Sequence, residues 1–333
     1  MCAKTLALLL LVSLSASPVF AGEETSAYAQ AIAAYQDRQL DKALKYAKEA
    51  VSLQADHIDA QFLLGHLYYL RQELQKAREC WQRAMKLAPG RQDIREALER
   101  LERETAIERD LSRNDVHPFI VRFAQGRIPI ETDALRQMLR DTYRKVGQSF
   151  AYFPDHPITV LLYPPADFDK VRGVSHQVLG FYDGKIRLPI QAGGLPGEEL
   201  ERVLWHEYTH ALVHDLSKGK CPLWLNEGIA TLQESRVRPV DVGVAKKAFQ
   251  AGQLPRWRQL WGQGYRASAL AEDYQTAYLL AQYLVKRWGW RELVDLLKRL
   301  GQGYPVEDAL RAQYGSDPAG IEKEWQRWLR NRL

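Results

Sequence analysis

The feature that most constrains this chain is a segment near the N-terminus that recurs 34 positions later. YQDRQLDKALKYAKEAVSLQAD, starting at Tyr35, aligns with YLRQELQKARECWQRAMKLAPG, starting at Tyr69. The aligned pairs include Leu40 with Leu74, Ala43 with Ala77, Ala50 with Ala84 and Leu53 with Leu87. Repeats of this length are typical of stacked structural units, each of which buries its apolar face only against a neighbour. The N-terminal part is therefore expected to be a stack of helix pairs, in which the alanines allow close approach.

The second copy also carries the pattern expected of the first helix of such a pair. The stretch LLGHLYYL places Leu64, Gly65 and Tyr68 ahead of the aligned segment. Residues 28–89 therefore resemble the tetratricopeptide repeat; a helical hairpin pair without repeat ancestry is the alternative. The one-sided polarity of RQDIREALERLERE, residues 91–104, predicts a capping helix. The resemblance implies that this module recruits a protein partner or substrate.

The first 21 residues have the parts of a secretory signal peptide. Lys4 gives a minimal positive start, LALLLLVSL is an apolar run, and SPVFA ends at Ala21. The run is much shorter than the roughly 20 residues that span a bilayer. We expect cleavage after Ala21, export to the periplasm or the cell exterior, and no membrane span in the mature chain. An uncleaved anchor is the alternative; a lipoprotein signal does not fit, because Cys2 precedes the apolar run.

The composition is that of a folded protein and does not point to nucleic acid. Hydrophobic residues make up 46% of the 333 residues, which argues against wholesale disorder. The net charge is only +5, and basic and acidic residues are interleaved, so no nucleic-acid partner is expected. After cleavage the chain keeps Cys80 and Cys221, for which two free thiols and a single bridge are both open.

Beyond the repeats, the pattern changes to alternating strands and helices. Strands are predicted at residues 117–124 and 157–164, and helices at 131–150 and 166–171. The segment VLGFYDGKIRLPI, residues 178–190, has two β-rich runs around Asp183-Gly184. This pair favours a two-residue hairpin turn, in which both positions need a positive φ. Alternating apolar and basic residues in the second arm predict a strand with one buried face. From residue 197 onward the pattern is mostly helical.

The segment LWHEYTHALVHDL raises the question of a metal site. His206 and His210 are four positions apart, so on a helix both imidazoles lie on one face and can reach a single ion. Glu207 points partly aside, where it can contact a metal-bound water without being a ligand. His214 continues the line but is expected to pack rather than to bind. The pattern also occurs by chance, and two histidines in a helix core are the alternative.

A third candidate ligand follows in the stretch PLWLNEGIATLQE. It places Glu227 among apolar residues of a second helical segment, rather than on a solvated face. Residues 218–222 are expected to form a turn, and an antiparallel return of this length brings Glu227 beside His206 and His210. Two histidines and a glutamate with an open fourth position are the set used by hydrolytic zinc, so the sequence predicts Zn²⁺ here. Cys221 is expected to be a loop residue, with metal contact as the alternative.

HEYTH followed by WLNEGIA resembles the gluzincin metallopeptidases of the thermolysin-like superfamily, in which a glutamate on the following helix completes the metal site. The likeness is closer to the peptidase MA-like domains of exported bacterial proteins, which are often joined to tetratricopeptide repeats. It runs from about residue 115 to the C-terminus and includes ITVLLYP, GFYDGKIRLP and YQTAYLLAQYLVKRWG. The gap between His210 and Glu227 is shorter than in gluzincin aminopeptidases, and their Gly-Ala-Met-Glu-Asn type motif is not seen. The resemblance therefore implies an endopeptidase-like or unassigned hydrolase rather than an aminopeptidase.

The resemblance also implies roles for further residues. Glu207 is expected to be the general base. Tyr274 is expected to donate to the developing oxyanion; Tyr278 is the alternative donor, and packing is the other role open to both. The strand at residues 185–189 is expected to border the cleft and, as a sheet edge, to pair with an extended substrate.

The chain is thus expected to be an α+β protein in three parts. Residues 1–21 form the signal peptide, residues 22–104 the tetratricopeptide repeats with their capping helix, and residues 105–333 the gluzincin-like domain. In that domain, a small mixed sheet and the zinc helices are expected at about 115–236, and a helical part at about 237–333. The function that follows is an exported zinc-dependent metallopeptidase. The alternative is a non-catalytic envelope scaffold with a zinc-stabilised, peptidase-like domain.

Overall fold

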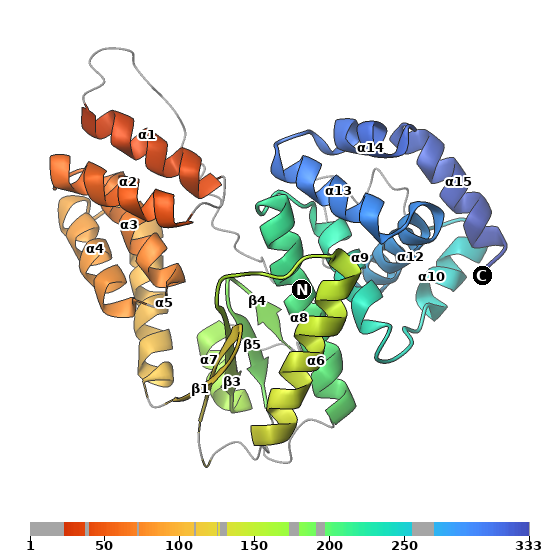
Figure 1. Ribbon diagram of the computed structural model, residues 1–333, viewed down its shortest axis with the longest axis horizontal. Coiled ribbons are helices and arrows are strands. Elements are labelled where there is room, and N and C mark those ends of the chain that lie inside the picture. Colours follow the sequence, from red (N-terminus) through yellow and green to blue (C-terminus); the bar gives the residue numbers. More distant parts are fainter. Residues whose placement is uncertain are drawn as a thin grey trace. The chain divides into compact units, whose positions relative to one another are not determined.

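The computed structural model describes part of the chain, which divides into two compact units (Figure 1). The described residues are 23–36, 40–71, 73–109, 111–124, 126, 132–172, 180–190, 197–254 and 270–332. The expected signal peptide and its cleavage site at Ala21 lie outside them. One unit contains the described residues up to Ser112 together with 166–172, and the other contains those from Arg113 to Pro165 and from 180 to 332.

The first unit is a stack of helices, as the repeat predicts. The helices are α1 (Glu23–Gln36), α2 (Leu40–Leu53), α3 (Ile58–Leu70), α4 (Leu74–Leu87) and α5 (Gln92–Glu108). Gly65 of α3 faces Trp81 of α4 so closely that a Cβ atom there would lie 2.4 Å from the indole ring. The capping helix expected at 91–104 is α5, which continues to Glu108. Small residues therefore set the spacing of the helices, as expected.

The second unit contains a small mixed β-sheet, so the fold class is α+β as expected. The strands are β1 (Ser112–Val116), β2 (Phe119–Phe123), β3 (Ile158–Tyr163), β4 (Phe181–Tyr182) and β5 (Ile186–Pro189). Their order is β1-β2-β3-β5-β4, with β2, β3 and β5 parallel and β4 antiparallel to β5. The central strand β3 is buried at every residue, which explains its continuous apolar sequence. The polar strand β1 was not predicted, because SRNDV lacks β-branched or aromatic residues apart from its last position.

The β4–β5 hairpin is confirmed, but its turn and its place in the sheet differ from expectation. Tyr182 pairs with Ile186, so residues 183–185 form the turn, and Gly184 is the turn residue with positive φ, at 96°. The strand at 185–189 was expected to be a sheet edge. That prediction was wrong, because β5 pairs with β3 on one side and with β4 on the other. Within the described sheet the two end strands are β1 and β4.

The basic face of β5 is buried, although the alternating pattern predicted a solvated face. Arg187 is 0% exposed. Its Nε lies 3.2 Å from Asp183 Oδ1, and its Nη1 donates a hydrogen bond to the Tyr163 hydroxyl. A buried charge is tolerated when it is paired and hydrogen-bonded, and these contacts provide that pairing. The prediction failed because the pattern does not reveal an acidic partner across the turn.

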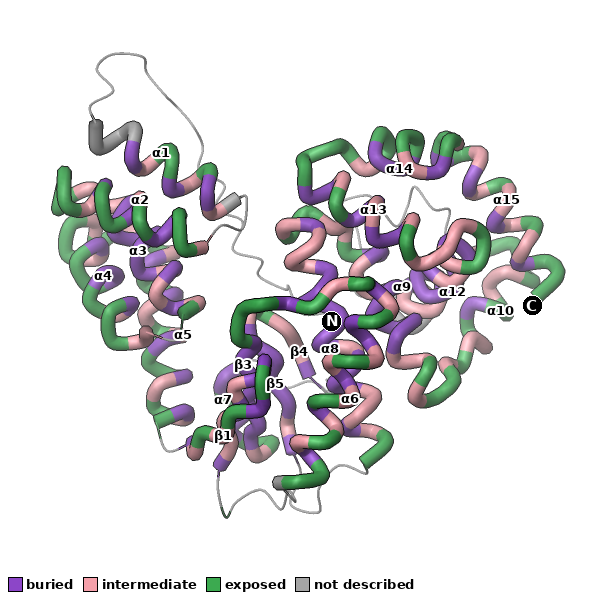
Figure 2. The backbone as a smooth tube through the Cα atoms, viewed as in Figure 1, coloured by how far each residue is buried: buried purple, intermediate pink, exposed green. Residues whose placement is uncertain are grey.

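Helices complete the second unit. Its helices are α6 (Thr132–Phe150), α8 (Gly197–Ser217), α9 (Leu223–Glu234), α10 (Gly243–Gln250), α12 (Leu270–Trp288), α13 (Trp290–Gly301), α14 (Val306–Tyr314) and α15 (Pro318–Arg330). The helix α7 (Pro165–Arg172) follows β3 in the sequence, but apart from Pro165 it is assigned to the first unit. Buried segments run through β3, β5, α8, α9 and α12 (Figure 2). Gly228 of α9 lies against Ala277 of α12, where a Cβ atom would be 2.4 Å from the Ala277 carbonyl oxygen. Tryptophans pack the C-terminal helices, with Trp325 fully buried and Trp288 stacked on Tyr314 at 4.4 Å. The core thus extends from the sheet into the helices that follow it.

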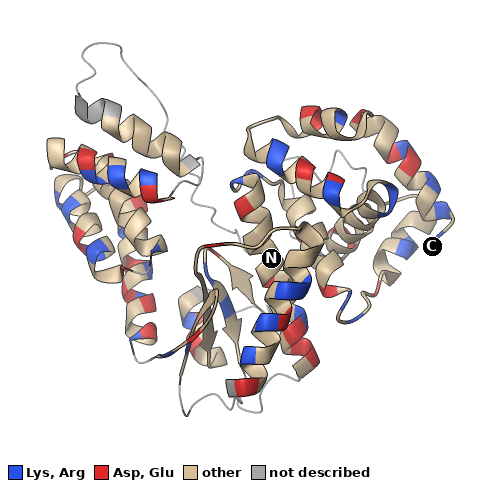
Figure 3. Ribbon diagram, in the orientation of Figure 1, with Lys and Arg blue, Asp and Glu red and all other residues tan. Residues whose placement is uncertain are grey.

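The structure also shows the distribution of charge, the apolar character of the helices and the state of the thiols. Basic and acidic side chains are interleaved along the helices (Figure 3). In the part of the chain that the structure describes, no helix combines the length and the apolar character needed to cross a bilayer. Cys80, in the repeat unit, is buried and Cys221, in the other unit, is half-buried, and both are free thiols in this structure.

Candidate active site

The helices α8 and α9 form a hairpin joined by a short turn. Gly219 has a left-handed backbone, with φ at 71°. Its N–H donates to the His214 carbonyl oxygen at 2.9 Å and thereby caps the last turn of α8. The Cys221 N–H donates to the Ser217 hydroxyl oxygen at 3.2 Å. The chain therefore reverses at residues 218–222, as the sequence predicts.

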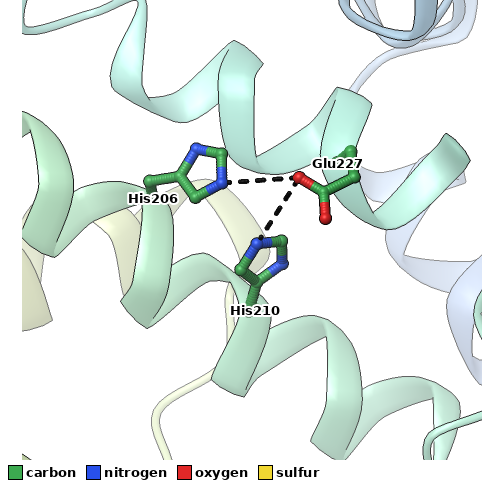
Figure 4. A group of neighbouring side chains, drawn as sticks. All are labelled: His206, His210 and Glu227. Carbon is green, nitrogen blue, oxygen red and sulfur yellow. Dashed lines mark ion pairs between the residues drawn. The ribbon is translucent and has the colours of Figure 1, made fainter. Parts of the chain in front are cut away.

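Three side chains from this hairpin converge on one point (Figure 4). The Nε2 atoms of His206 and His210, on α8, lie 3.5 Å and 3.8 Å from Oε2 of Glu227, on α9. One potential ligand atom from each residue lies within 4.8 Å of the other two. The two imidazole rings are nearly perpendicular, at 85°, with centroids 4.7 Å apart. Spacing by one helical turn thus aims both rings at the same point, and the hairpin supplies the carboxylate.

Each histidine is also held through its other ring nitrogen by a residue of α9. His206 Nδ1 donates to Glu234 Oε2 at 3.1 Å, and His210 Nδ1 donates to Asn226 Oδ1 at 2.9 Å. Carboxylate and amide oxygens only accept hydrogen bonds, so each Nδ1 carries the proton. In the neutral rings, each Nε2 then presents its lone pair toward Glu227. Outer contacts of this kind orient metal-binding histidines and set their tautomer.

The carboxyl group of Glu207 lies in an enclosed space on the same helix. Glu207 is 5% exposed, and its Oε2 is buried without a hydrogen-bond partner among the described residues. Its Oε1 lies near Gly180, just before β4, where a Cβ atom would be 3.1 Å from Oε1 and 2.6 Å from Leu188 Cδ2. Glycine at this position therefore lets the chain that enters β4 approach the carboxyl group. A buried unpaired carboxylate oxygen costs stability, which is typical of a group kept for chemistry.

Burial and mutual charge shift the pKa values of the cluster in opposite directions. Burial, together with the charges of Glu227 and Glu234, raises the pKa of Glu207 from 4.5 to about 8 against the lowering effect of His206. Burial lowers the pKa of His210. Burial also lowers the pKa of His206, but hydrogen bonds to Glu227 and Glu234 outweigh it and leave that pKa well above 6.5. For Glu227, burial raises the pKa, but the charges of both histidines outweigh it. Perturbed pKa values in a buried cluster are typical of functional sites.

The donor set fits a zinc ion. Zinc ligands lie about 2.0–2.2 Å from the ion, so ligand atoms in a tetrahedral site are about 3.4 Å apart. The separations of 3.5 Å and 3.8 Å between the nitrogens and the carboxylate oxygen are close to this value. Two imidazoles and one carboxylate also match the three-ligand set of hydrolytic zinc sites, which keep a fourth position open.

Family models match both parts of the chain. Residues 198–331 match the Peptidase MA superfamily, and residues 58–91 match the tetratricopeptide repeat. The chain therefore contains a Peptidase MA domain. A search of the curated proteins found no match to the chain. The first match includes α8 and α9, and the second includes α3 and α4, so both resemblances expected from the sequence are confirmed.

The two tyrosines considered as oxyanion donors in the Peptidase MA domain lie on α12. Tyr278 is 6% exposed, and its hydroxyl accepts a hydrogen bond from Gln282 Nε2 of the same helix at 3.0 Å. This environment fits a packing role. Tyr274 is half-buried one turn before Ala277, the residue of α12 that meets α9. Tyr274 therefore belongs to the helix that supports Glu227, but it is not part of the group of three.

His214 and Cys221 also lie outside that group. Among the described residues, the side chains that could hold a metal together are His206, His210 and Glu227. The ring of His214 meets that of Tyr182 edge-on, with centroids 5.8 Å apart. Burial and the charge of Glu227 raise the pKa of the Cys221 thiol.

Three residues of the site were missed by the sequence analysis. Asn226 directly precedes Glu227, and Glu234 follows it after seven positions, about two helical turns. A search of α9 for polar residues next to Glu227 and two turns beyond it could have found both. Gly180 gave no comparable signal, because its role depends on the packing of β4 against Glu207.

Proposed function

We propose that this protein is an exported zinc-dependent metallopeptidase that hydrolyses peptide bonds in protein or peptide substrates. The observation that carries the proposal is the convergence of His206, His210 and Glu227 beside the buried carboxyl group of Glu207. The Peptidase MA match supports a peptidase in general. The donor set and its spacing support zinc. The missing aminopeptidase-type motif argues against a requirement for a free substrate amine.

Each side chain has a defined role in the proposal. His206, His210 and Glu227 hold the ion through Nε2, Nε2 and Oε2. A zinc ion bound there would supply an acidified water and polarise the scissile carbonyl. Glu207 takes a proton from the attacking water and delivers it to the leaving amine. Gly180 supports this role, because the lack of a side chain leaves room beside Oε1.

We assign the oxyanion donor to Tyr274. Its helix packs on α9 at Gly228, the residue after Glu227. Tyr278 is less suited, because its side chain is buried, at 6% exposed, whereas Tyr274 is half-buried. Loss of one oxyanion donor typically lowers kcat by about 10²–10³-fold. Tyr274→Phe should therefore reduce kcat to this extent and leave zinc binding intact, whereas Tyr278→Phe should change kcat little.

Localisation and domain division belong to the same proposal. Residues 1–21 are taken as a signal peptide cleaved after Ala21, residues 22–104 as the repeat module and residues 105–333 as the peptidase domain. The tetratricopeptide match supports protein binding, so the repeats would recruit a partner or a substrate. Hydrolysis would then take place in the periplasm or outside the cell.

The first test is the metal content of the chain from Gly22 onward, made without a metal-binding tag. The proposal predicts about one zinc per chain, as in other three-ligand sites. His206→Ala and Glu227→Ala should lose the metal, and Glu207→Gln should keep it. An unfolded protein such as casein then tests hydrolysis, with Glu207→Gln as the inactive control. A parent chain that takes up no zinc would overturn the proposal. A Glu207→Gln variant that keeps its full function would favour the scaffold alternative.

A further inference from the structure

A network of four charged side chains adjoins the metal-binding histidines where α8 begins and α9 ends. Arg202 Nη1 donates to Glu234 Oε2 at 2.8 Å, and the same Oε2 accepts from His206 Nδ1 at 3.1 Å. Arg202 Nη2 donates to Glu199 Oε1 at 2.6 Å. Arg238 Nη2 lies 3.0 Å from Glu199 Oε2 at the outer end of the network. A continuous chain of charge-assisted contacts therefore leads from the protein surface to His206.

Helix geometry explains why these residues meet. Arg202 and His206 are four positions apart on α8 and so share a face. Glu227 and Glu234 are seven positions apart on α9, which is close to two full turns, and so they too share a face. One carboxylate of α9 therefore meets His206 at Nε2 and the other meets it at Nδ1. Both ring nitrogens of His206 therefore contact carboxylates from the same face of α9.

The inner part of the network is largely removed from water. The side chains of Arg202 and Glu234 are 16% and 12% exposed, whereas that of Arg238 is 53% exposed. Buried charges are costly unless they are paired, and replacing buried ion pairs by apolar residues often stabilises a protein. Stabilising the packing of α8 against α9 therefore explains these buried charges poorly. Their contact with a metal-binding histidine supplies a stronger one.

The two histidines are supported differently. His210 Nδ1 contacts the neutral amide of Asn226, whereas His206 Nδ1 contacts a carboxylate that is itself held by a guanidinium group. Carboxylate partners fix the orientation of a ligating imidazole and raise its basicity, and their loss typically weakens metal binding by about 10–100-fold. Arg202 has no contact with a metal ligand except through Glu234 in this network. Any effect of Arg202 on the ion must therefore pass through Glu234.

We propose that Glu234 and Arg202 are positioning residues for the metal site: Glu234 fixes the ring of His206, and Arg202 fixes Glu234. The proposal deepens the zinc site proposed above and rests on it. It predicts an order of effects on zinc affinity: Glu234 first, Arg202 second, and the outer residue Arg238 with almost none. A network that only holds the two helices together would change the stability of the metal-free protein and leave zinc affinity alone.

The test measures zinc dissociation constants by competition with a chelator, using the full mature chain. Glu234→Gln should bind zinc about 10–100-fold more weakly. Arg202→Met, which keeps the apolar stem, should fall at the lower end of that range, and Arg202→Lys should recover part of the loss. Arg238→Met is the matched control, because it removes an exposed member of the same network, and it should stay within about twofold of the parent. Urea unfolding of the metal-free proteins reports any purely structural effect.

A double variant decides whether Arg202 acts through Glu234. If it does, Glu234→Gln combined with Arg202→Met should bind zinc no more weakly than Glu234→Gln alone. Multiplicative losses would overturn the role of Arg202, and equal zinc affinity in all single variants would overturn the whole proposal. Should Glu234→Gln fail to fold, Glu234→Asp and Arg202→Lys answer the same question with smaller changes. A parent chain without zinc would overturn the zinc site itself, and this is seen before any variant is made.

Discussion

The chain contains two helical hairpins, α3–α4 in the repeat unit and α8–α9 in the Peptidase MA domain, that use their closest contacts differently. In the repeat unit, α3 and α4 pack through Gly65, whose missing side chain admits the ring of Trp81. In the α8–α9 hairpin, the close contact at Gly228 of α9 is instead with Ala277 of α12, outside the hairpin. In the first hairpin the close contact therefore joins its own two helices. The second is fixed from outside, which leaves its inner face to Glu227 and the histidines.

Both hairpins bury polar atoms that have no hydrogen-bond partner among the described residues, Gln61 Oε1 of α3 being one, but their buried tryptophans differ. The indole N–H of Trp81 donates to the Phe62 carbonyl oxygen at 3.0 Å. In α8, by contrast, Glu207 Oε2 and the indole nitrogen of Trp205 are buried without hydrogen-bond partners among the described residues. Unpaired buried polar atoms cost stability, and they concentrate where a protein binds or reacts. In α8 the unpaired carboxylate oxygen belongs to Glu207, next to the metal-ligand candidate His206, which indicates that this hairpin gives up some stability for chemistry.

Trp81→Ala is expected to cause the largest loss of stability, and it should affect only the repeat unit. Trp81 is 1% exposed and fills the space between α3, α4 and α5. Truncation of a buried tryptophan typically costs about 3–5 kcal/mol, so the repeat unit should melt first in thermal unfolding followed by circular dichroism. Zinc per chain should stay unchanged, because the repeat unit supplies none of the three ligands. If the variant lost zinc when its repeat unit unfolded, the two hairpins would not be independent of each other.

A smaller stability effect, coupled to the site, is expected from Gly228→Ala. The added Cβ atom would lie 2.4 Å from the Ala277 carbonyl oxygen, which is backbone and cannot rotate away, so α9 must shift. Overpacking of this kind typically costs about 1–3 kcal/mol. The shift also moves Glu227, so zinc affinity should fall in the same variant. Urea unfolding and chelator competition measure the two effects.

Gly197→Ala provides the matched control for that variant. Gly197 opens α8, and a Cβ atom there would meet no heavy atom within 4 Å. Its unfolding free energy should change by less than about 0.5 kcal/mol, as for other surface substitutions. Similar zinc loss in both variants would show that helix composition, and not the contact with α12, explains the effect.

The contrast between the hairpins also explains what the sequence could and could not predict. Short segments with a helical period encode both the repeat and the three candidate ligands. The repeat forms stacked helices as expected, and His206, His210 and Glu227 converge as expected. Gly180 acts through a strand that precedes α8, and Arg202 acts through a carboxylate on another helix. Contacts between distant elements leave no periodic signal. The same limit explains why β5 was wrongly expected to be an edge strand, since its parallel pairing with β3 depends on the finished sheet.

Glu207→Gln is expected to change how the stability of the metal-free protein depends on pH. Burial raises the pKa of Glu207 from 4.5 to about 8, so between these values the folded protein holds a proton that the unfolded chain has released. The folded state then binds more protons, and stability falls as pH rises through this window. The variant lacks this loss, so it should match the parent near pH 4.5 and exceed it by about 1–3 kcal/mol at pH 8. Urea unfolding in chelator across this range measures the difference; a constant difference would contradict the assigned burial.

Tyr69→Phe is expected to cause the smallest loss of stability, and it tests the buried carboxylate of the repeat unit. Glu104 of α5 is also a buried carboxylate, at 1% exposed, but the Tyr69 hydroxyl contacts both of its oxygens at 2.8 Å and 2.7 Å. Removing one hydrogen bond to a charged group while other contacts remain should cost about 1 kcal/mol. A double-mutant cycle with Glu104→Gln isolates this coupling from the effect of burial. Coupling near zero would mean that the repeat unit tolerates an unsatisfied buried carboxylate as readily as the candidate site does, and the pairing of buried carboxylates would then not distinguish the two units.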